Sequence, residues 1–432
     1  MLKKYVLWRL RRLTKKYFKR HAPKLIVVVG SVGKTGTKVA IATVLGEKYR
    51  VRMHEENHNT EFSAPLAMLG VKYPTNPHSM SQWLQVFGAM KKRIKSDSDV
   101  DVIVQELGID APGDMKHFSQ FMHADIAVVT AVTPEHMENM KTMEAVAEEE
   151  LSVSSFAGLT VINRDTIAPE YAKYVTSSNL TTYGVQPGAE YFLEINSSSP
   201  LESKIATLHS PEWGDTSLAI QLVGHHNVQA IAAAAAVCAK LGISQKEFAV
   251  GAAKVTPLPG RMQLLRGANG SIIIDDSYNS SPAAAIEALK TLQSSQGAKR
   301  IAILGSMNEL GEYSEQGHRD VANVCQPSLI DWVVTIGDDA AQYLAPIARQ
   351  NGCHVKSFKT PFEAGGFVRG VAGERDIILV KGSQNNVFSE EAVKILLHDA
   401  EDEKKLVRQS QEWMAKKEQA FDHAPEDEVP IV

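Results

Sequence analysis

The residues best suited to chemistry near the start of the chain form the run Gly30-Ser31-Val32-Gly33-Lys34-Thr35. Glycines let backbone N–H groups close around phosphate oxygens, and a helix N-terminus adds positive potential. In such a loop Lys34 would bind the β- and γ-phosphates of a nucleotide, and Thr35 would place its hydroxyl on Mg²⁺. The run therefore predicts a P-loop for ATP, although the full pattern has Gly where this chain has Val28. The predicted nucleotide-binding residues of this loop are Gly30, Ser31, Gly33, Lys34, Thr35 and Gly36.

Two further polar side chains follow apolar runs. Glu106 ends the run that begins at Asp101, and His136 follows the run 126–130. In open α/β sheets ligands gather at the carboxyl ends of strands, so Glu106 is placed to hold Mg²⁺. A solvated acid and a structural histidine are the plainer interpretations of these two residues. The prediction is a metal and catalytic site near the P-loop.

The elements that must position these residues alternate between strand and helix. From Lys24 onward short apolar runs are separated by helical segments, which is typical of a mostly parallel sheet. Residues 180–222 differ, and we expect them to form an antiparallel β addition, followed by a helix over 228–241. A second strand–helix series starts near Leu258. The expected strands are 25–29, 102–104, 126–129, 272–274, 301–304, 332–336 and 377–380.

The first 23 residues carry nine Lys or Arg and no acid. Their apolar side chains recur at helical spacing, which predicts a basic amphipathic helix. That helix could pack on its own protein, bind an anionic membrane surface, or bind a partner. We expect four segments: this helix (1–23), a central ATP-binding domain (24–256), a C-terminal α/β domain (257–398), and a charged helix and tail (399–432). The helical stripe consists of Leu2, Val6, Leu10, Leu13 and Tyr17.

Composition excludes several classes of protein. The 432 residues have a formal net charge of −4, so no global field favours nucleic acid. No apolar run reaches the roughly 18–20 residues that span a bilayer. The three cysteines are far apart, and we expect them to be reduced and buried, as suits a cytoplasmic protein.

Further motifs appear in a fixed order along the chain. They are Asn57-His58-Asn59-Thr60 with Ala64-Pro65-Leu66, Glu106-Leu107-Gly108 with Gly113-Asp114-Met115, Gly224-His225-His226-Asn227, Pro259-Gly260-Arg261, Asp275-Asp276-Ser277-Tyr278-Asn279, Met307-Asn308-Glu309-Leu310-Gly311-Glu312 with His318, and Lys381-Gly382-Ser383. Together with the P-loop and His136, they resemble the Mur ligases, and most closely the members that add D-alanyl-D-alanine. The similarity runs from about residue 24 to about residue 397.

The resemblance implies a P-loop ATPase domain of α/β class followed by a Rossmann-like α/β domain. It implies an ATP- and Mg²⁺-dependent ligase that forms an amide through an acyl phosphate in peptidoglycan synthesis. It also assigns roles to residues. The catalytic residues are Lys34, Glu106, His136 and Arg261; the metal ligands are Thr35, Glu106, His136 and Glu150; the further nucleotide-binding residues are His226, Asn227, Arg261, Asp276, Tyr278 and Asn279; the substrate residues are Asn57, Asn59, Thr60, Glu309, His318, Lys381 and Ser383.

Three features depart from that family. The P-loop begins at residue 30, which leaves no room for the N-terminal domain that grips the UDP-linked sugar. The carbamoylated lysine that usually supports a second Mg²⁺ falls within 147–150, and Glu150 could take its ligand role. Gln384 stands where an arginine usually follows Lys-Gly-Ser, and a glutamine cannot replace that charge toward a carboxylate.

These departures keep other functions open. The leading hypothesis is a muropeptide ligase that uses D-Ala-D-Ala or a related amine. The chain could instead be an amide ligase for another acceptor, such as a polyglutamate or a lipid-linked peptide. The third hypothesis is a nucleotide-binding regulator that has no catalytic activity. We expect a cytoplasmic enzyme, with contact to a membrane if residues 1–23 bind lipid.

Overall fold

The computed structural model describes residues 2–54, 58–196, 201–383 and 387–422, together with the backbone but not the side chains of His225 and His226. Asn57, the side chain of His226, Gln384 and the tail 423–432 therefore lie outside the described residues. The chain divides into two compact units. Unit 1 comprises 1–198 and 202–256, and unit 2 comprises 199–201 and 257–432.

Unit 1 is built on one nine-stranded sheet with the order β2-β3-β1-β4-β5-β6-β7-β8-β9. Every pair from β2 to β7 is parallel, and β7, β8 and β9 are antiparallel. The strands are β1 (Lys24–Val29), β2 (Val51–Met53), β3 (Val102–Glu106), β4 (Ala124–Val129), β5 (Ala157–Asn163), β6 (Leu180–Gly184), β7 (Tyr191–Ile195), β8 (Lys204–Ser210) and β9 (Gly214–Ile220).

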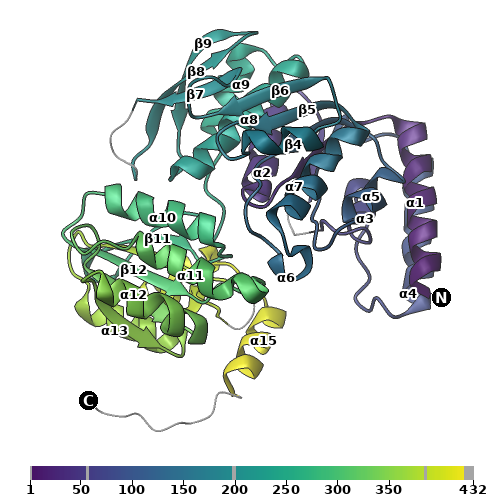
Figure 1. Ribbon diagram of the computed structural model, residues 1–432. Coiled ribbons are helices and arrows are strands. Elements are labelled where there is room, and N and C mark those ends of the chain that lie inside the picture. The colour runs from purple at the N-terminus through teal and green to yellow at the C-terminus, as the bar shows by residue number, and fades with distance from the viewer. Residues whose placement is uncertain (1, 55–57, 197–200, 384–386, 423–432) are drawn as a thin grey trace. The chain divides into compact units, whose positions relative to one another are not determined.

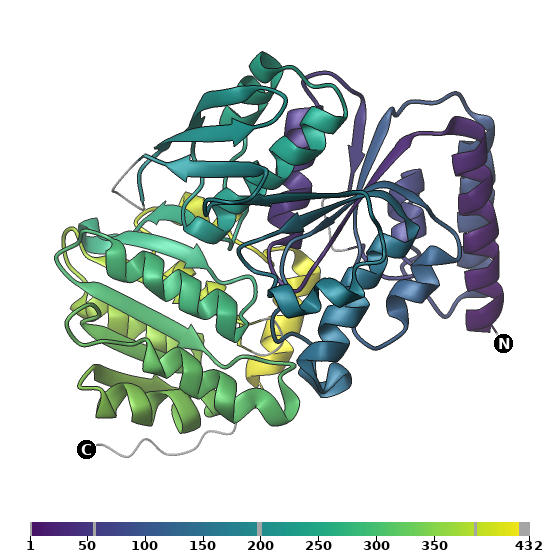
Figure 2. The ribbon, with the colours of Figure 1, turned by 45° about the horizontal axis from the view of Figure 1, so that its top comes forward.

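Helices cover both faces of this sheet (Figures 1 and 2). Ile26 and Val28 of β1 pack in one core with α2 and α8, while Leu25, Val27 and Val29 pack in a second core on the other face. Burial on both faces explains why these strands are continuous apolar runs. The helices are α1 (Leu2–His21), α2 (Lys34–Leu45), α3 (Ala64–Leu69), α4 (Met80–Lys95), α5 (Asp114–Ser119), α6 (Met137–Met140), α7 (Met143–Leu151), α8 (His225–Lys240) and α9 (Gln245–Ala253), with 3₁₀ turns at Ser152–Phe156 and Pro169–Tyr174.

The expectation for residues 180–222 was partly wrong. β6 is parallel to β5, and β7 is parallel to β6, so the antiparallel part begins only with the β7–β8 pair. The β6–β7 pairing joins only two residue pairs, Tyr183 with Tyr191 and Gly184 with Phe192. The connection between β6 and β7 is short and contains no helix. The sequence therefore lacks the helical pattern that would have indicated a parallel pair.

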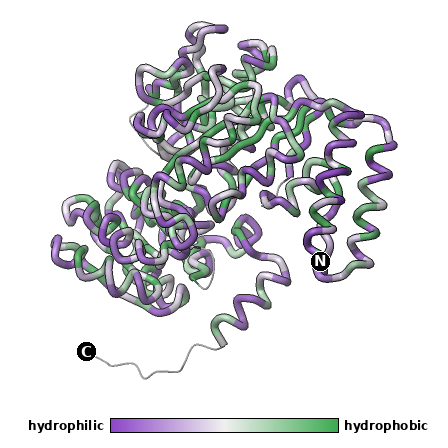
Figure 3. The backbone as a smooth tube through the Cα atoms, turned by 45° about the vertical axis from the view of Figure 1, so that its right-hand side comes forward, coloured by the Kyte–Doolittle hydropathy of each residue, from purple (hydrophilic) through white to green (hydrophobic). Residues whose placement is uncertain are grey.

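The predicted N-terminal helix exists and lies against α4 (Figures 1 and 3). Its buried stripe consists of Val6, Leu10, Leu13, Thr14 and Tyr17, so the helix packs on its own protein. Leu2, at its start, is only partly buried. Within the described part of the chain, no helix has both the length and the apolar character that crossing a bilayer requires.

Unit 2 contains a six-stranded sheet with the order β10-β11-β15-β12-β13-β14, in which only the β10–β11 pair is antiparallel. All three cysteines of the chain are free and buried, as predicted. The strands are β10 (Gln263–Arg266), β11 (Ile272–Asp276), β12 (Arg300–Gly305), β13 (Trp332–Ile336), β14 (His354–Phe358) and β15 (Ile377–Lys381). The helices are α10 (Pro282–Ser294), α11 (Ser314–Asn323), α12 (Ala345–Gln350), α13 (Pro361–Val371), α14 (Glu390–Leu396) and α15 (Gln411–Asp422), with a π-helical turn at Ala340–Leu344 and 3₁₀ turns at Ala268–Gly270, Gly311–Tyr313 and Ala400–Lys405.

Candidate functional site

The loop between β1 and α2 depends on two glycines. Gly30 has a φ of +122°, and a Cβ there would lie 2.3 Å from the Thr130 hydroxyl. Gly33 has a φ of +85° and caps α2. Both conformations are strained for other residue types. Thr130, which follows β4, donates a hydrogen bond to the Val32 carbonyl at 2.5 Å, so the neighbouring strand fixes the loop.

Lys34, the first residue of α2, is folded back onto this loop. Its Nζ donates to the carbonyl oxygens of Gly30 (2.5 Å) and Ser31 (3.2 Å) and lies 3.2 Å from Oε2 of Glu135. Burial lowers the pKa of Lys34, but the charges of Glu135, Glu150 and Glu106 outweigh it and raise that pKa above its ordinary value. Lys34 is therefore a fixed cation among carboxylates, which suits a phosphate-binding lysine.

Glu150 brings a carboxylate from α7 to the same loop. Its Oε2 accepts a hydrogen bond from the Gly30 N–H at 2.7 Å, and the residue is 1% exposed. Burial raises the pKa of Glu150 to about 8, although the positive charge of Lys34 opposes this. The side chain of the preceding residue, Glu149, points to a different loop and accepts a hydrogen bond from the Gly113 N–H. Of the predicted glutamate run, Glu150 is thus the member that reaches the P-loop.

Thr35 and Glu106 bring a hydroxyl and a carboxylate oxygen together beside this loop. The Thr35 hydroxyl, in the first turn of α2, donates to Oε2 of Glu106, at the end of β3, at 2.9 Å. Asn59 donates to the other carboxylate oxygen at 3.4 Å, and the Lys38 ammonium lies 3.7 Å from Oε2. Hydroxyl and carboxylate oxygens are the ligands that Mg²⁺ prefers. This pair fits the expected magnesium ion.

His136 lies at the start of α6 in the left-handed backbone region, with a φ of +52°. Its Nδ1 is 3.3 Å from Oδ1 of Asp110, and its Nε2 is 3.9 Å from Oε1 of Glu135. Glu135 therefore connects the imidazole to Lys34. A strained backbone that carries a polar side chain is a feature found at functional sites.

The remaining predicted residues of unit 1 have local roles in this structure. Ser31 accepts a hydrogen bond from the Thr133 N–H at 3.0 Å, and Thr60 pairs with Ser63 at 2.9 Å. Gly36 lies in the first turn of α2 with open space where a Cβ would be. The side-chain amide of Asn227, in the first turn of α8, donates a hydrogen bond to the Val223 carbonyl just before that helix.

In unit 2 the ends of β11 and β15 meet. Asp276 and Lys381 are register partners in this parallel pair, and their side chains form a buried ion pair of 2.8 Å. Lys381 also donates to the Asn279 carbonyl at 2.6 Å, and Ser383 donates to Oδ1 of Asn279 at 3.3 Å. Four residues predicted from separate motifs are therefore joined in one network.

Arg261 and Tyr278 form a second contact in this unit. The guanidinium of Arg261 lies 4.2 Å from the centre of the Tyr278 ring, which is a cation–π distance. The Tyr278 N–H donates to the Gly260 carbonyl at 3.0 Å. This hydrogen bond joins the Pro-Gly-Arg turn to the segment that follows β11. The arrangement places a cation beside an aromatic face.

His318 is fully buried, and both ring nitrogens have backbone partners. Nε2 accepts from the Met307 N–H at 3.0 Å, and Nδ1 lies 2.8 Å from the Ser314 carbonyl. Burial lowers the pKa of His318. These contacts favour a structural role for His318, which the family resemblance placed among the substrate residues. Within the loop that His318 supports, Glu309 has a φ of +66°.

Sequence reasoning missed three charged residues. Lys38 lies one helical turn after Lys34, and that spacing could have revealed it. Glu135 directly precedes His136, but nothing in its surroundings distinguished it from a solvated acid. Arg408, in the segment after Leu397, donates to the Ser277 and Tyr278 carbonyls and pairs with Glu390 at 2.7 Å. No local pattern indicated that this charged segment returns to the end of β11.

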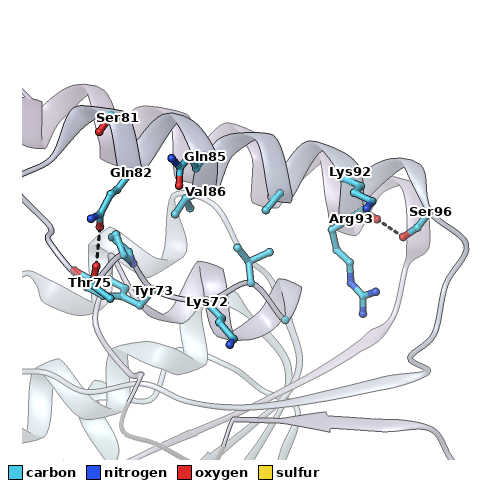
Figure 4. A pocket seen from close by; sticks show the side chains of 14 residues that line it. Lys72, Tyr73, Thr75, Ser81, Gln82, Gln85, Val86, Lys92, Arg93 and Ser96 are labelled. Atoms are coloured by element: carbon cyan, nitrogen blue, oxygen red, sulfur yellow. Dashed lines mark hydrogen bonds between the residues drawn. The ribbon is translucent and has the colours of Figure 1, made fainter. Parts of the chain in front are cut away.

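Among the described residues, no group of three or more His, Cys, Asp or Glu side chains is arranged to hold a metal ion. A groove of about 820 Å³ lies elsewhere in unit 1, between α4 and residues 70–75 (Figure 4). Its lining is basic or neutral and includes Lys72, Tyr73 and Lys92. Because no carboxylate lines it, this groove lacks the metal-binding groups of the P-loop region.

The chain matches known families over most of its length. The family models described as "Mur ligase middle domain" and "Mur ligase, glutamate ligase domain" match residues 28–238 and 260–384. A UDP-N-acetylmuramoyl-tripeptide–D-alanyl-D-alanine ligase from Bacillus subtilis is 29% identical over 396 residues, which cover 90% of this chain and 79% of the relative.

Solved structures show the same fold. MurF from Acinetobacter baumannii superposes with a TM-score of 0.75 at 22% identity, over 90% of this chain and 80% of that one. MurF ligase from Thermotoga maritima, in complex with ADP, superposes with a TM-score of 0.74 at 22% identity, over 92% of this chain and 84% of that one.

Proposed function

The chain belongs to the Mur ligase family, and on that premise we propose that it uses ATP to add D-alanyl-D-alanine to a UDP-linked muramoyl tripeptide. The name of the Bacillus subtilis relative supports these substrates. The observation that carries the proposal is the site itself. Lys34, which is folded onto the loop after β1, adjoins the oxygen pair formed by Thr35 in the first turn of α2 and Glu106 at the end of β3.

The reaction has two steps. A carboxylate oxygen of the acceptor attacks the γ-phosphorus of ATP, the bond to the β-phosphate oxygen breaks, and ADP leaves. The amine nitrogen then attacks the acyl phosphate, inorganic phosphate leaves with the electron pair of the C–O bond, and the nitrogen loses a proton. Both steps place negative charge on phosphoryl oxygens, so positioning and cationic stabilisation dominate the catalysis.

The residues of unit 1 have distinct parts in this scheme. Lys34 neutralises the β- and γ-phosphates, for which it must exchange its contacts with the loop carbonyls for phosphate oxygens. Thr35 and Glu106 hold Mg²⁺, which when bound supplies charge neutralisation at the phosphates. We place His136 and Glu150 at a second metal position, because both lie next to residues that contact Lys34.

Unit 2 contributes nucleotide and substrate contacts. Arg261 supplies a cation, and Tyr278 and Asn279 contact the nucleotide. Lys381 and Ser383 bind the second substrate. In the described structure Lys381 is neutralised by Asp276, so a substrate carboxylate must compete with that ion pair at 2.8 Å.

The test measures phosphate release and product mass with ATP, Mg²⁺, UDP-N-acetylmuramoyl-tripeptide and D-alanyl-D-alanine, each omitted in turn. Release that needs every component, with a pentapeptide product, supports the proposal. ATP binding without release on this pair would reject these substrates and favour another acceptor, such as a polyglutamate.

The Lys34→Ala variant tests the role of Lys34 at the phosphate site. We expect kcat to fall by about 10²–10³ or more, the loss seen when one stabilising group for a developing charge is removed. The exposed Lys254, which pairs with Glu47 in the same unit, gives the control variant Lys254→Ala with near-normal turnover. A Lys34→Ala enzyme of normal rate would show that the phosphate site is assigned wrongly.

A further inference from the structure

Positive charge in this protein is concentrated on two adjacent helices. α1 and α4 together carry 13 Lys or Arg and no Asp or Glu. The rest of the chain has 33 Lys or Arg against 50 Asp or Glu, a balance of −17. Of the acids on other elements, Glu61 pairs with Arg11, and Asp99 pairs with Arg93. Most of the basic side chains remain directed to solvent.

The same helices expose large apolar side chains. Of nine exposed large hydrophobic residues in the described part of the chain, four lie here: Tyr5 (40% exposed), Trp8 (51%), Met80 (42%) and Leu84 (57%). All four lie in the first halves of their helices. All four cations of α4 lie in its second half, whereas the nine cations of α1 are spread along the whole helix.

The two helices lie side by side and run in the same direction. Arg20 donates to the Lys95 carbonyl, and His21 lies 3.1 Å from the Ile94 carbonyl, so their C-terminal ends meet. At the other end, the Tyr5 ring is 6.1 Å from Trp8. Tyr5 is also 6.3 Å from Phe87, a buried residue of α4. The N-terminal halves, which carry the exposed apolar side chains, therefore lie next to each other, as do the C-terminal ends (Figures 1 and 3).

The exposed side chain of Trp8 is surrounded by positively charged side chains. The guanidinium groups of Arg9 and Arg12 lie 6.0 and 5.5 Å from the Trp8 ring. A shallow groove of about 660 Å³ follows this side of α1 and is lined by Lys4, Trp8, Arg12, Lys15, Lys16 and Lys19, among others. Aromatic rings flanked by Lys and Arg are the usual composition of a protein surface at the level of lipid headgroups.

We propose that this surface, the α1–α4 face formed by Tyr5, Trp8, Met80, Leu84 and the exposed cations of both helices, docks on an anionic phospholipid bilayer. Charge complementarity selects an anionic partner, and the four apolar side chains select one with an apolar interior. Because the stripe from Val6 to Tyr17 is already buried in the protein, α1 would lie flat on the bilayer rather than insert through it. This peripheral docking goes beyond the ligase reaction and does not depend on it.

The experiment measures partitioning of the full chain onto vesicles of phosphatidylcholine alone and of phosphatidylcholine mixed with phosphatidylglycerol. We expect binding to the mixed vesicles only, weakened by salt. The triple variant Lys15→Glu, Lys16→Glu, Lys19→Glu should lower the partition coefficient by a factor of about 100 or more, since each cation near an anionic surface contributes about fivefold. Acyl chains labelled with bromine should quench Trp8 emission, and Trp8→Phe should remove that quenching.

A matched control carries the same charge change on exposed lysines outside these helices: Lys173→Glu, Lys246→Glu, Lys356→Glu. Trp8→Ala should weaken binding to the mixed vesicles, and Ile205→Ala, at an exposed apolar residue of β8, is its control. Both controls should bind as the wild type does, and thermal unfolding reports whether each variant is folded. The proposal is overturned by no binding of the full chain, by equal binding to both vesicles, by equal losses in the control triple, or by self-association or nucleic-acid binding through this face in place of lipid binding.

Discussion

Glu150 and Glu148 lie two residues apart on α7, but Glu148 is exposed whereas Glu150 is buried against the Gly30 N–H. If Glu150 supports a second metal ion, Glu150→Ala should raise the Mg²⁺ concentration for half-maximal rate by about 10–100-fold, the range for lost support of a bound metal. Glu148→Ala should leave the Mg²⁺ curve of the wild type. The measurement is phosphate release against Mg²⁺ at saturating ATP. An unchanged curve for Glu150→Ala would remove Glu150 from the metal site.

Asp275, next to Asp276, gives a prediction about pH. It is fully buried, Oδ2 has no hydrogen-bond partner among the described residues, and burial raises its pKa to about 6. The folded state then holds a proton that the unfolded state, with a pKa near 4, has lost. The contribution of Asp275 to stability should therefore fall as the pH rises from about 4 to about 6, by about 3 kcal/mol in total, and stay lower above that window.

The matching variant is Asp275→Asn, which cannot ionise. Denaturant unfolding of this variant, followed between about pH 4 and pH 7, should lack this fall, so that it is more stable than the wild type near neutral pH. Asp338→Asn, at an exposed position of the same unit, should keep the wild-type profile. Profiles of the wild type and of Asp275→Asn that run parallel across this window would contradict the assignment.

At the scale of elements, the segment after α14 fixes the end of β11. Arg408 makes two hydrogen bonds to the fully buried Glu390, at 2.8 and 2.7 Å, and donates to the Ser277 and Tyr278 carbonyls. Arg408→Ala leaves Glu390 with Lys417, which lies 3.0 Å from Oε1. Removing one partner of a buried pair costs about 3–5 kcal/mol, and because Lys417 remains we expect about 3 kcal/mol.

Thermal and denaturant unfolding test this loss, and the KM for ATP should rise because the Tyr278 segment is loosened. Lys404→Ala, which breaks the exposed pair with Glu401, is the control and should change stability by less than about 1 kcal/mol. An Arg408→Ala protein as stable as the wild type would mean that residues 399–422 do not anchor this strand end.

The strands that the sequence predicted are buried on both faces, although the equally buried β5 was not among them. β1, β3 and β4 of unit 1 and β11, β12, β13 and β15 of unit 2 are continuous apolar runs, as expected for strands that are covered on both faces. β14 was missed because its pattern, His354–Phe358, is mostly exposed at a sheet edge. β2 was missed because it has three half-buried residues. Edge strands take their structure from pairing with a neighbour, and that pairing leaves little trace in composition.

The contacts within the site could likewise be predicted only in part from the sequence. Strand-end reasoning predicted that Glu106 lies near the P-loop, and the structure places its Oε2 2.9 Å from the Thr35 hydroxyl. The ion pair of Asp276 with Lys381 depends on the register of β11 and β15, which are about 100 residues apart in the sequence. Neither motif contains that information. Glu135 has a role only through its distance to Lys34, so it could not be recognised before the fold was known.

At the scale of the whole molecule, each unit has its own buried core, two clusters in unit 1 and one described in unit 2. A domain with its own core can fold alone. We therefore expect fragments 1–256 and 257–432, produced separately, each to show a cooperative unfolding transition. This outcome would support the proposed boundary after residue 256.

The same fragments test how the reaction depends on both units. Lys34, Thr35 and Glu106 belong to fragment 1–256, whereas Arg261 and Lys381 belong to fragment 257–432. If residues of both units are needed, neither fragment alone should release phosphate from ATP with the two substrates present, although fragment 1–256 should retain weak ATP binding that Lys34→Ala abolishes. The full chain, assayed in parallel, is the control for substrate quality. Turnover by a folded fragment 1–256 would show that the cation of Arg261 is dispensable, and the chemistry would then belong to the P-loop unit alone.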